Sequence, residues 1–100
     1  MNIHAINKYT DYRPTTKLVQ DLLDSARENV KDIMNRPVWC LQGLRFKEKS
    51  SKGTDYIVEA LVDRECEVEI HLHKASPRYQ TAVSVVSVKP VCKTYSASAR

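Results

Sequence analysis

The feature that most constrains the fold is an apolar pattern that repeats every three or four residues and then stops at Pro37. The repeating residues are Leu18, Leu22, Ala26, Val30, Ile33 and Met34, with Val19 and Leu23 beside them. This spacing places them on one face of an α-helix of about five turns. Pro14 suits a helix entry, and Thr15 or Thr16 can cap the first turn. Asn35, Arg36 and Pro37 should end the helix, because a residue before proline is disfavoured in helical conformation.

After Pro37 the apolar period changes to two, which is typical of β-strands. The expected strands are residues 38–49 ("VWCLQGLRFKEK"), 54–63, 66–74 and 80–90, with turns at "SSKG", Arg64–Glu65 and "ASPRY". In the first strand Trp39, Leu41 and the Leu44/Phe46 pair alternate with a change of phase at Gly43, which predicts a bulge there. The inward residues of the next two strands are expected to be Tyr56, Val58, Ala60 and Val62, then Cys66, Val68, Ile70 and Leu72.

One helix followed by four strands with tight turns predicts an α+β domain, in which one long helix covers one face of a curled antiparallel sheet. The chain has 100 residues, which is the usual size of a single domain. Residues 1–13 show no consistent period and are expected to form an extended arm or an extra first strand, which gives a sheet of four or five strands. Residues 91–100 are expected to form a polar tail.

Charge and cysteine usage exclude several classes of protein. The net charge is +4, from 16 basic and 12 acidic residues that are scattered along the chain, so nucleic acid is not the expected partner. The longest apolar run is too short to cross a membrane, and the first residues lack the features of a signal peptide. The expected location is the cytoplasm, with secretion after removal of a signal peptide as the alternative.

Cys40, Cys66 and Cys92 do not have the spacing of a zinc site. One disulfide together with one free thiol stays open as an arrangement of these three cysteines.

Few residues suggest catalysis. His71 and His73 share one face of a strand with Glu67 and Glu69 and could supply half of a zinc or copper site, but an exposed strand face is the simpler interpretation. Cys66 alternates with core residues and is expected to be buried and inert. The chain has no glycine-rich phosphate loop and no nucleophile paired with a base, so we expect no enzyme and no cofactor.

Lysines gather at the first hairpin. Lys47, Lys49 and Lys52 lie close in sequence to Tyr56, and such a cluster could bind a nucleic acid strand. Glu48 dilutes the charge, so a solvated turn is the favoured interpretation.

The order of elements and several short strings resemble the cystatins, specifically the stefin type. "GTDYIVEA", Gly53 to Ala60, is similar to the G-T-N-Y-Y-I-K-V that follows the first hairpin motif of that family. "HKASP", His73 to Pro77, is similar to the F-K-S-L-P that leads into the second hairpin. The resemblance extends from about Pro14 to Pro90.

The resemblance implies a reversible, non-covalent inhibitor of papain-like cysteine proteases. Members of the family insert an N-terminal arm and two hairpins into the protease cleft. The corresponding positions here are Tyr9 and Tyr12 in the arm, then Lys49, Ser50, Ser51, Lys52 and Gly53 in the first hairpin, and Pro77 and Arg78 in the second.

This chain departs from the family pattern at the first hairpin. Of the family's Q-V-V-A-G only Gly53 is kept, with Lys49 in place of glutamine and Ser50 and Ser51 in place of the valines. Burial of one valine side chain is worth about 1.5–3 kcal/mol, and 1.4 kcal/mol is about tenfold in affinity. We therefore expect inhibition that is weaker by at least about a hundredfold, or of altered specificity. The alternative is a non-inhibitory interaction module with the same fold.

Overall fold

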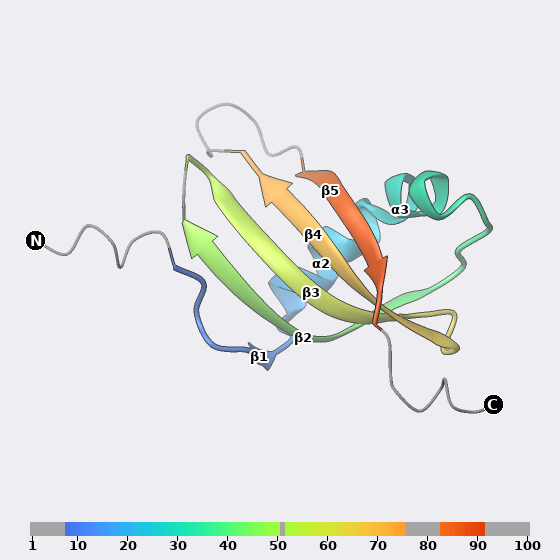
Figure 1. The fold of residues 1–100 in the computed structure, drawn as a ribbon, viewed down its shortest axis with the longest axis horizontal. Coiled ribbons are helices and arrows are strands. Elements are labelled where there is room, and N and C mark those ends of the chain that lie inside the picture. Colours follow the sequence, from blue (N-terminus) through green and yellow to red (C-terminus); the bar gives the residue numbers. More distant parts are fainter. Residues whose placement is uncertain (1–7, 51, 76–82, 92–100) are drawn as a thin grey trace, which may run out of the picture.

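The computed structural model describes residues 8–50, 52–75 and 83–91, which form two helices and one five-stranded sheet (Figure 1). The elements in chain order are β1 (Arg13–Pro14), α2 (Lys17–Ser25), α3 (Arg27–Met34), β2 (Leu41–Ser50), β3 (Thr54–Val62), β4 (Cys66–Lys74) and β5 (Val83–Pro90). The strands are antiparallel and lie in sequence order, so the sheet is a meander. Neither described helix is long and apolar enough to cross a membrane.

The expected α+β class is confirmed, and the antiparallel sheet, for which four or five strands were expected, has five. The expectation of one long helix is wrong. The helical segment is interrupted at Ala26, whose φ of −96° and ψ of 1° lie outside the helical range. The Ser25 hydroxyl donates to the Leu22 carbonyl oxygen at 2.9 Å, and the Ala26 N–H is shared between the carbonyls of Leu22 and Leu23. A serine that bonds back to its own helix bends the helix, which explains the division into α2 and α3.

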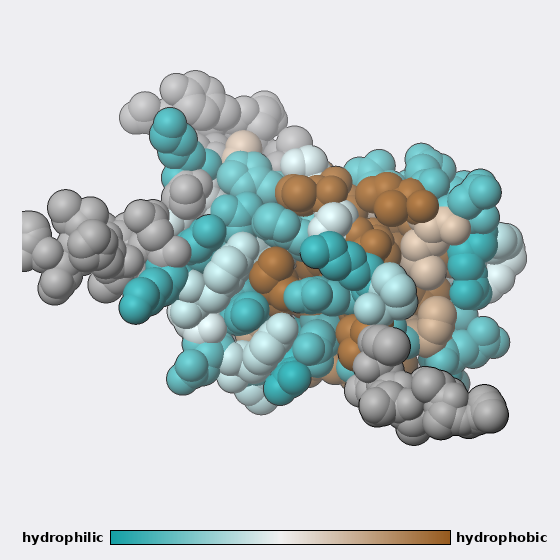
Figure 2. Space-filling model, in the orientation of Figure 1, coloured by the Kyte–Doolittle hydropathy of each residue, from teal (hydrophilic) through white to brown (hydrophobic). Residues whose placement is uncertain are grey.

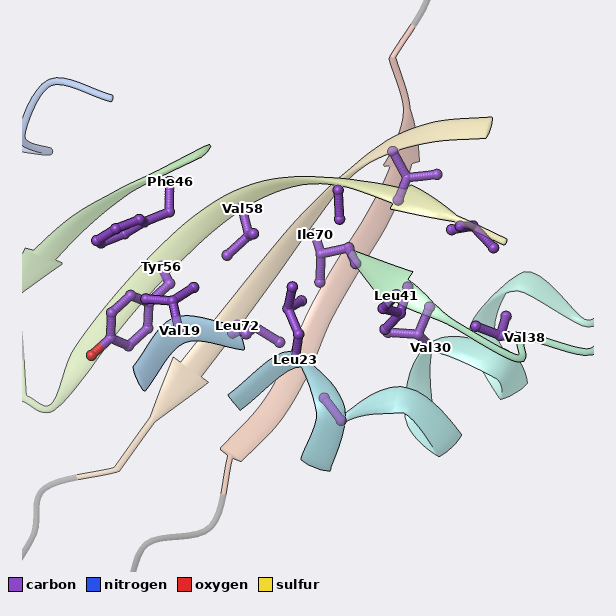
Figure 3. Packing of buried hydrophobic residues seen from close by; sticks show 14 residues of the cluster. Val19, Leu23, Val30, Val38, Leu41, Phe46, Tyr56, Val58, Ile70 and Leu72 are labelled. Atoms are coloured by element: carbon purple, nitrogen blue, oxygen red, sulfur yellow. The ribbon is translucent and has the colours of Figure 1, made fainter. Parts of the chain in front are cut away.

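The core lies between these helices and the sheet (Figure 3). The helices contribute Val19, Leu23, Ala26 and Val30, and the predicted inward residues of β3 are all buried, as are Val68, Ile70 and Leu72 of β4. Leu18 and Ile33, which the sequence pattern placed in the core, are 57% and 47% exposed. The buried stripe is therefore rotated by about one residue from the predicted one. Cys66 is half-buried rather than fully buried and packs against the core.

The first predicted strand begins later than expected, at Leu41. Val38 is buried but Trp39 is 77% exposed and Leu44 is 37% exposed, so neither is a core residue. The Asp63 carboxylate explains the later start of the strand and the exposure of Trp39. Its Oδ1 accepts hydrogen bonds from the backbone N–H groups of Trp39 and Cys40, each at 2.8 Å. These two bonds hold the segment before β2 against the β3–β4 turn and direct the indole into solvent.

The bulge predicted at Gly43 is confirmed, since the β2–β3 register shifts between Gly43 and Arg45. The Gln20 side chain bridges this irregularity: its Nε2 donates to the Leu41 carbonyl and its Oε1 accepts from the Gly43 N–H, both at 2.9 Å. A Cβ atom on Gly43 would lie 2.8 Å from Thr15 Cγ2 and 3.1 Å from Leu23 Cδ1. Glycine therefore allows α2 and the segment before it to lie directly on β2.

Gly43→Ala should lower the free energy of unfolding by about 1–3 kcal/mol, because the added methyl group overlaps Thr15 and Leu23. Thr15→Ala removes both Thr15 atoms that crowd Gly43, and its Oγ1 is buried without a hydrogen-bond partner among the described residues, so that change alone should have little effect. Urea unfolding of both variants and of the double variant measures the coupling. If Gly43→Ala lowers the free energy of unfolding as much in the Thr15→Ala background as in the wild type, the added methyl group does not overlap Thr15.

Candidate binding site at the hairpin end of the sheet

The N-terminal arm, Lys8 to Tyr12, runs beside β2 and antiparallel to it, with its first residues nearer the tip of the first hairpin. The Thr10 N–H donates to the Glu48 carbonyl at 2.9 Å, and the Glu48 N–H donates to the Thr10 hydroxyl at 3.1 Å. In β1, Arg13 is paired with Phe46, and its guanidinium lies 5.0 Å from the Phe46 ring and 3.3 Å from the Glu48 carboxylate. The arm is thus attached to β2 through backbone and side-chain contacts.

Two tyrosines of the arm alternate with three cations of β2. The Arg45 guanidinium lies 4.0 Å from the Tyr12 ring centre, and Lys47 Nζ lies 5.0 Å from the same ring. Lys47 Nζ and Lys49 Nζ then lie 5.3 Å and 4.8 Å from the Tyr9 ring. Because every second residue of a strand points to the same face, these three cations share the face of the sheet opposite the helices. Tyr9, Tyr12 and Lys49, all predicted site residues, are therefore brought together.

Carboxylates border this series of rings and cations. Glu59 accepts two hydrogen bonds from the Arg45 guanidinium, at 2.8 and 3.3 Å. Partial burial raises the pKa of the Tyr12 hydroxyl, and the negative charges of Glu59 and Glu69 raise it further. Partial burial likewise raises the pKa of Tyr9, with Asp55 and Glu69 adding to the effect. Both tyrosines therefore stay neutral at physiological pH and act as neutral rings beside cations.

The tip of the first hairpin packs onto the end of β4. Gly53 has a φ of +110°, and a Cβ atom there would lie 2.5 Å from the Lys74 carbonyl oxygen and 3.2 Å from His73 Nε2. Glycine is required at this position for both its backbone conformation and its contact with β4. Ser50 and Lys52 are exposed, so the hydroxyl and the ammonium group are open to a partner. Ser51 lies outside the described residues.

The β4–β5 connection begins and ends at this same end of the sheet. Thr54 is paired with Lys74, and Lys74 is paired with Val83, so the first hairpin and the two ends of the connection lie in one row. Figure 1 shows the β2–β3 tip beside the end of β4. The predicted site residues Pro77 and Arg78 belong to the connection and lie outside the described residues.

Asp55 links two histidines on the same face, an arrangement that the sequence analysis missed. Its Oδ1 lies 3.1 Å from His71 Nε2 and 3.0 Å from His73 Nδ1. Partial burial by itself would raise the pKa of Asp55, but the hydrogen bonds from His73 and His71 outweigh it, so the pKa is lowered below 3.8. The predicted outward orientation of His71 and His73 is consistent with this contact. No group of three or more His, Cys, Asp or Glu side chains within the described ranges is placed to hold a metal ion.

Two hollows lie away from the hairpin tip, on either side of Trp39. One has a volume of about 520 Å³ and lies between α3 and the segment that follows it, including Arg36, Pro37 and Val38. The other, of about 330 Å³, is lined by Trp39, Cys40, Asp63 and Arg64. None of the predicted site residues lines these two hollows. On the face of the sheet that carries the arm, Figure 2 shows hydrophilic side chains over β2 and brown, hydrophobic groups toward β5.

Tyr12→Ala should lower the free energy of unfolding by about 1–2 kcal/mol, because each of its two cation–aromatic contacts is worth about 0.5–1 kcal/mol. It should also increase hydrogen exchange at the Thr10 N–H, since the arm is less firmly held. Tyr12→Phe keeps the ring and is the matched control, with a smaller loss. Equal losses in the two variants, measured by urea unfolding, would show that the ring contacts contribute nothing.

Asp55→Asn should reduce the dependence of stability on acid. A carboxyl group whose pKa is lowered on folding stabilises the folded state above its unfolded pKa, and that contribution is lost as pH falls through the folded pKa. The stability difference between wild type and Asp55→Asn should therefore be larger at about pH 5 than at about pH 2.5, as measured by urea unfolding at each pH. If the stability difference between the two proteins stays constant or widens on acidification, the pKa of Asp55 is not lowered on folding.

The hairpin end of the sheet thus collects tyrosine rings, lysine ammonium groups and hydroxyl groups from segments that are far apart in sequence. Its described side chains are mostly half-buried or exposed and include no paired nucleophile and base. No family model matches the chain, and no curated protein sequence shows significant similarity to it.

Proposed function

We propose that the protein is a reversible inhibitor of papain-like cysteine proteases, weak or of altered specificity, and that the hairpin end of the sheet is its contact surface. The observation that carries this proposal is the position of three segments at one end of the molecule. These segments are the arm, the β2–β3 tip and the connected ends of β4 and β5. An inhibitor that fills a cleft needs its contacts to project in one direction.

The geometry of the described arm and first hairpin also supports a preformed contact at these two segments. The arm is bonded to Glu48, and the tip is fixed on β4 by the contact between Gly53 and Lys74. A surface that is ordered before binding loses less conformational entropy when a partner arrives. This favours inhibition by docking of a preformed end of the sheet.

The chemistry of the tip favours a partner with acidic groups around its cleft. Lys49 and Lys52 supply positive charge, and Lys49 already stacks on Tyr9, so its side chain offers a combined cationic and aromatic contact. Charges at the border of an interface mainly affect the rate and the salt dependence of association. The inhibition constant should therefore weaken as ionic strength rises.

The second candidate function is a non-inhibitory interaction module, and the polar tip is the observation that favours it. The described tip residues Lys49, Ser50, Lys52 and Gly53 offer no large apolar side chain to bury in a protease cleft. In that case the same end of the sheet would bind another protein through its lysines and tyrosines.

Titration of papain and of a cathepsin with the protein tests the inhibitor proposal. We expect inhibition with a constant in the range of nanomolar to micromolar, and Lys49→Glu with Lys52→Glu should weaken it at least about tenfold through reversed charge. Lys89→Glu is the matched control, because this exposed lysine of β5 is paired with Glu69 of β4 and lies about 20 Å from the strand end at Val83. It should leave the constant unchanged.

The outcomes separate the two candidates. Absence of inhibition at tens of micromolar would contradict the inhibitor proposal. Capture of a protein from native extract by the wild type, lost in the Lys49→Glu, Lys52→Glu variant and kept in Lys89→Glu, would then support the interaction module. If the wild type and both variants capture the same partner equally, the hairpin tip is not the surface that binds that partner.

A further inference from the structure

Asp55 holds two histidines at the hairpin end of the sheet through a single carboxylate oxygen. Its Oδ1 lies 3.1 Å from His71 Nε2 and 3.0 Å from His73 Nδ1. An ionised carboxylate can only accept hydrogen bonds, so each of these two ring nitrogens carries a proton. A neutral imidazole has a single N–H group, and the other ring nitrogens, His71 Nδ1 and His73 Nε2, are therefore unprotonated when the rings are neutral. Each ring can still take up one more proton.

The unprotonated nitrogen of His73 faces the hairpin tip. A Cβ atom on Gly53 would lie 3.2 Å from His73 Nε2, so the edge of the imidazole lies against the tip. The side chains of His71 and His73 are 27% and 34% exposed, compared with 17% for Asp55. Both rings are therefore accessible to protons from the solvent, although the carboxylate that joins them is largely covered.

The charged groups around the two histidines come from the arm, the hairpin tip and three strands. On the described elements they are Lys47 and Lys49 of β2, Lys52 of the tip, Asp55 of β3, and Glu69 and Lys74 of β4, together with the hydroxyl group of Tyr9. Arg45 and Glu59, further along the same face, are bonded to each other. β5 places the uncharged Ser84 opposite His73 and Ser87 opposite His71. Among these groups, only imidazole ordinarily changes its charge between about pH 5 and 8.

We propose that the hairpin end of the sheet binds an acidic protein partner more tightly as the pH falls from about 7.5 to about 5.5, because His71 and His73 take up protons. With both rings neutral, the cluster carries the single negative charge of Asp55; with both protonated, it carries one net positive charge. Protonation also converts His73 Nε2 from an acceptor to a donor at the tip. The added positive charge acts together with Lys49 and Lys52 on the carboxylates of the partner.

This pH dependence rests on the proposed function only in taking the hairpin end as the contact surface. The lowered pKa of Asp55 agrees with it, because the carboxylate stays ionised in this pH range and continues to accept from both rings. The cluster therefore gains positive charge without releasing either histidine. The matching partner is a protein with acidic side chains at the border of its binding surface.

A peptide of about ten aspartates is the first probe, because its carboxylates stay ionised at both pH values. Its dissociation constant is measured at about pH 7.5 and 5.5, at constant ionic strength, for the wild type and for the double variant His71→Gln with His73→Gln. We expect the wild type to bind about three- to tenfold more tightly at the lower pH, and the variant to change less than about twofold. Glutamine keeps an N–H group for Asp55 but gains no charge.

Lys49→Glu with Lys52→Glu should weaken binding of the peptide at both pH values, whereas Lys89→Glu should leave it unchanged. Urea unfolding at about pH 7.5 checks that the histidine variant is folded. If it is not, His73→Gln alone should reduce the tightening, because this ring faces the tip. Equal tightening in the wild type and the histidine variant, or none in the wild type, would overturn the proposal.

Papain whose catalytic cysteine is blocked separates this pH dependence from the proposed function. The groups of papain that titrate affect the wild type and the histidine variant alike, so the difference between the two proteins isolates the cluster. Histidine-dependent tightening with the peptide, but no binding of papain at either pH, would support the acidic-partner site and contradict the inhibitor proposal. Binding of papain without any histidine-dependent tightening would support the inhibitor proposal and contradict the role of the histidines.

Discussion

The contact between α2 and the bulge of β2 is the constraint on which the rest of the structure depends. At Gly43 the absence of a side chain lets Thr15 and Leu23 approach the strand, and Gln20 satisfies the backbone groups that the bulge removes from the ladder. Backbone groups that are buried without a partner are costly, so the bulge and the glutamine stabilise each other. Because this contact fixes α2 over the sheet, it also determines which face of β2 is covered and which face remains for the arm.

The arm is held on the face of β2 opposite the helices, although only two of its residues pair with β2 as a strand. β1 has only the pair Arg13–Pro14, and a pairing of this length contributes little by itself. The arm is held instead by rings and cations that alternate, from Arg45 through Tyr12, Lys47 and Tyr9 to Lys49. This series ends at the hairpin tip, so the contacts that secure the arm also define the border of the candidate binding site.

Much of the fold could be predicted from the sequence, where local pattern and tertiary packing agree. The bounds of β4, the inward residues of β3 and the bulge at Gly43 follow from strict alternation and from the conformational properties of glycine. The division of the helix depends on the bond from Ser25 to Leu22, which competes with an otherwise helical pattern. Trp39 was misplaced because Asp63, which is distant in sequence, binds the backbone before β2.

The candidate site was less predictable, because its contacts cross between strands. The contacts between Tyr9 and Lys49, and between Asp55 and the two histidines, depend on registers that periodicity alone does not give. A signal was nevertheless present. Aligning β2 and β3 on the turn that contains Gly53 pairs Lys49 with Asp55, and aligning β3 and β4 on the turn between Val62 and Cys66 pairs Asp55 with His73. Strand registers inferred from turns could therefore have located the cluster.

The central claim is that the arm, the first hairpin and the end of β4 act together as one protein-binding surface. The most direct measurement is amide NMR of isotopically labelled protein mixed with papain whose catalytic cysteine is blocked. The account predicts signal changes concentrated at Lys8–Thr10, Lys49–Thr54 and Lys74–Ala75, with Trp39 and the β3–β4 turn unaffected. Absence of any change, or changes centred on Trp39, would contradict it.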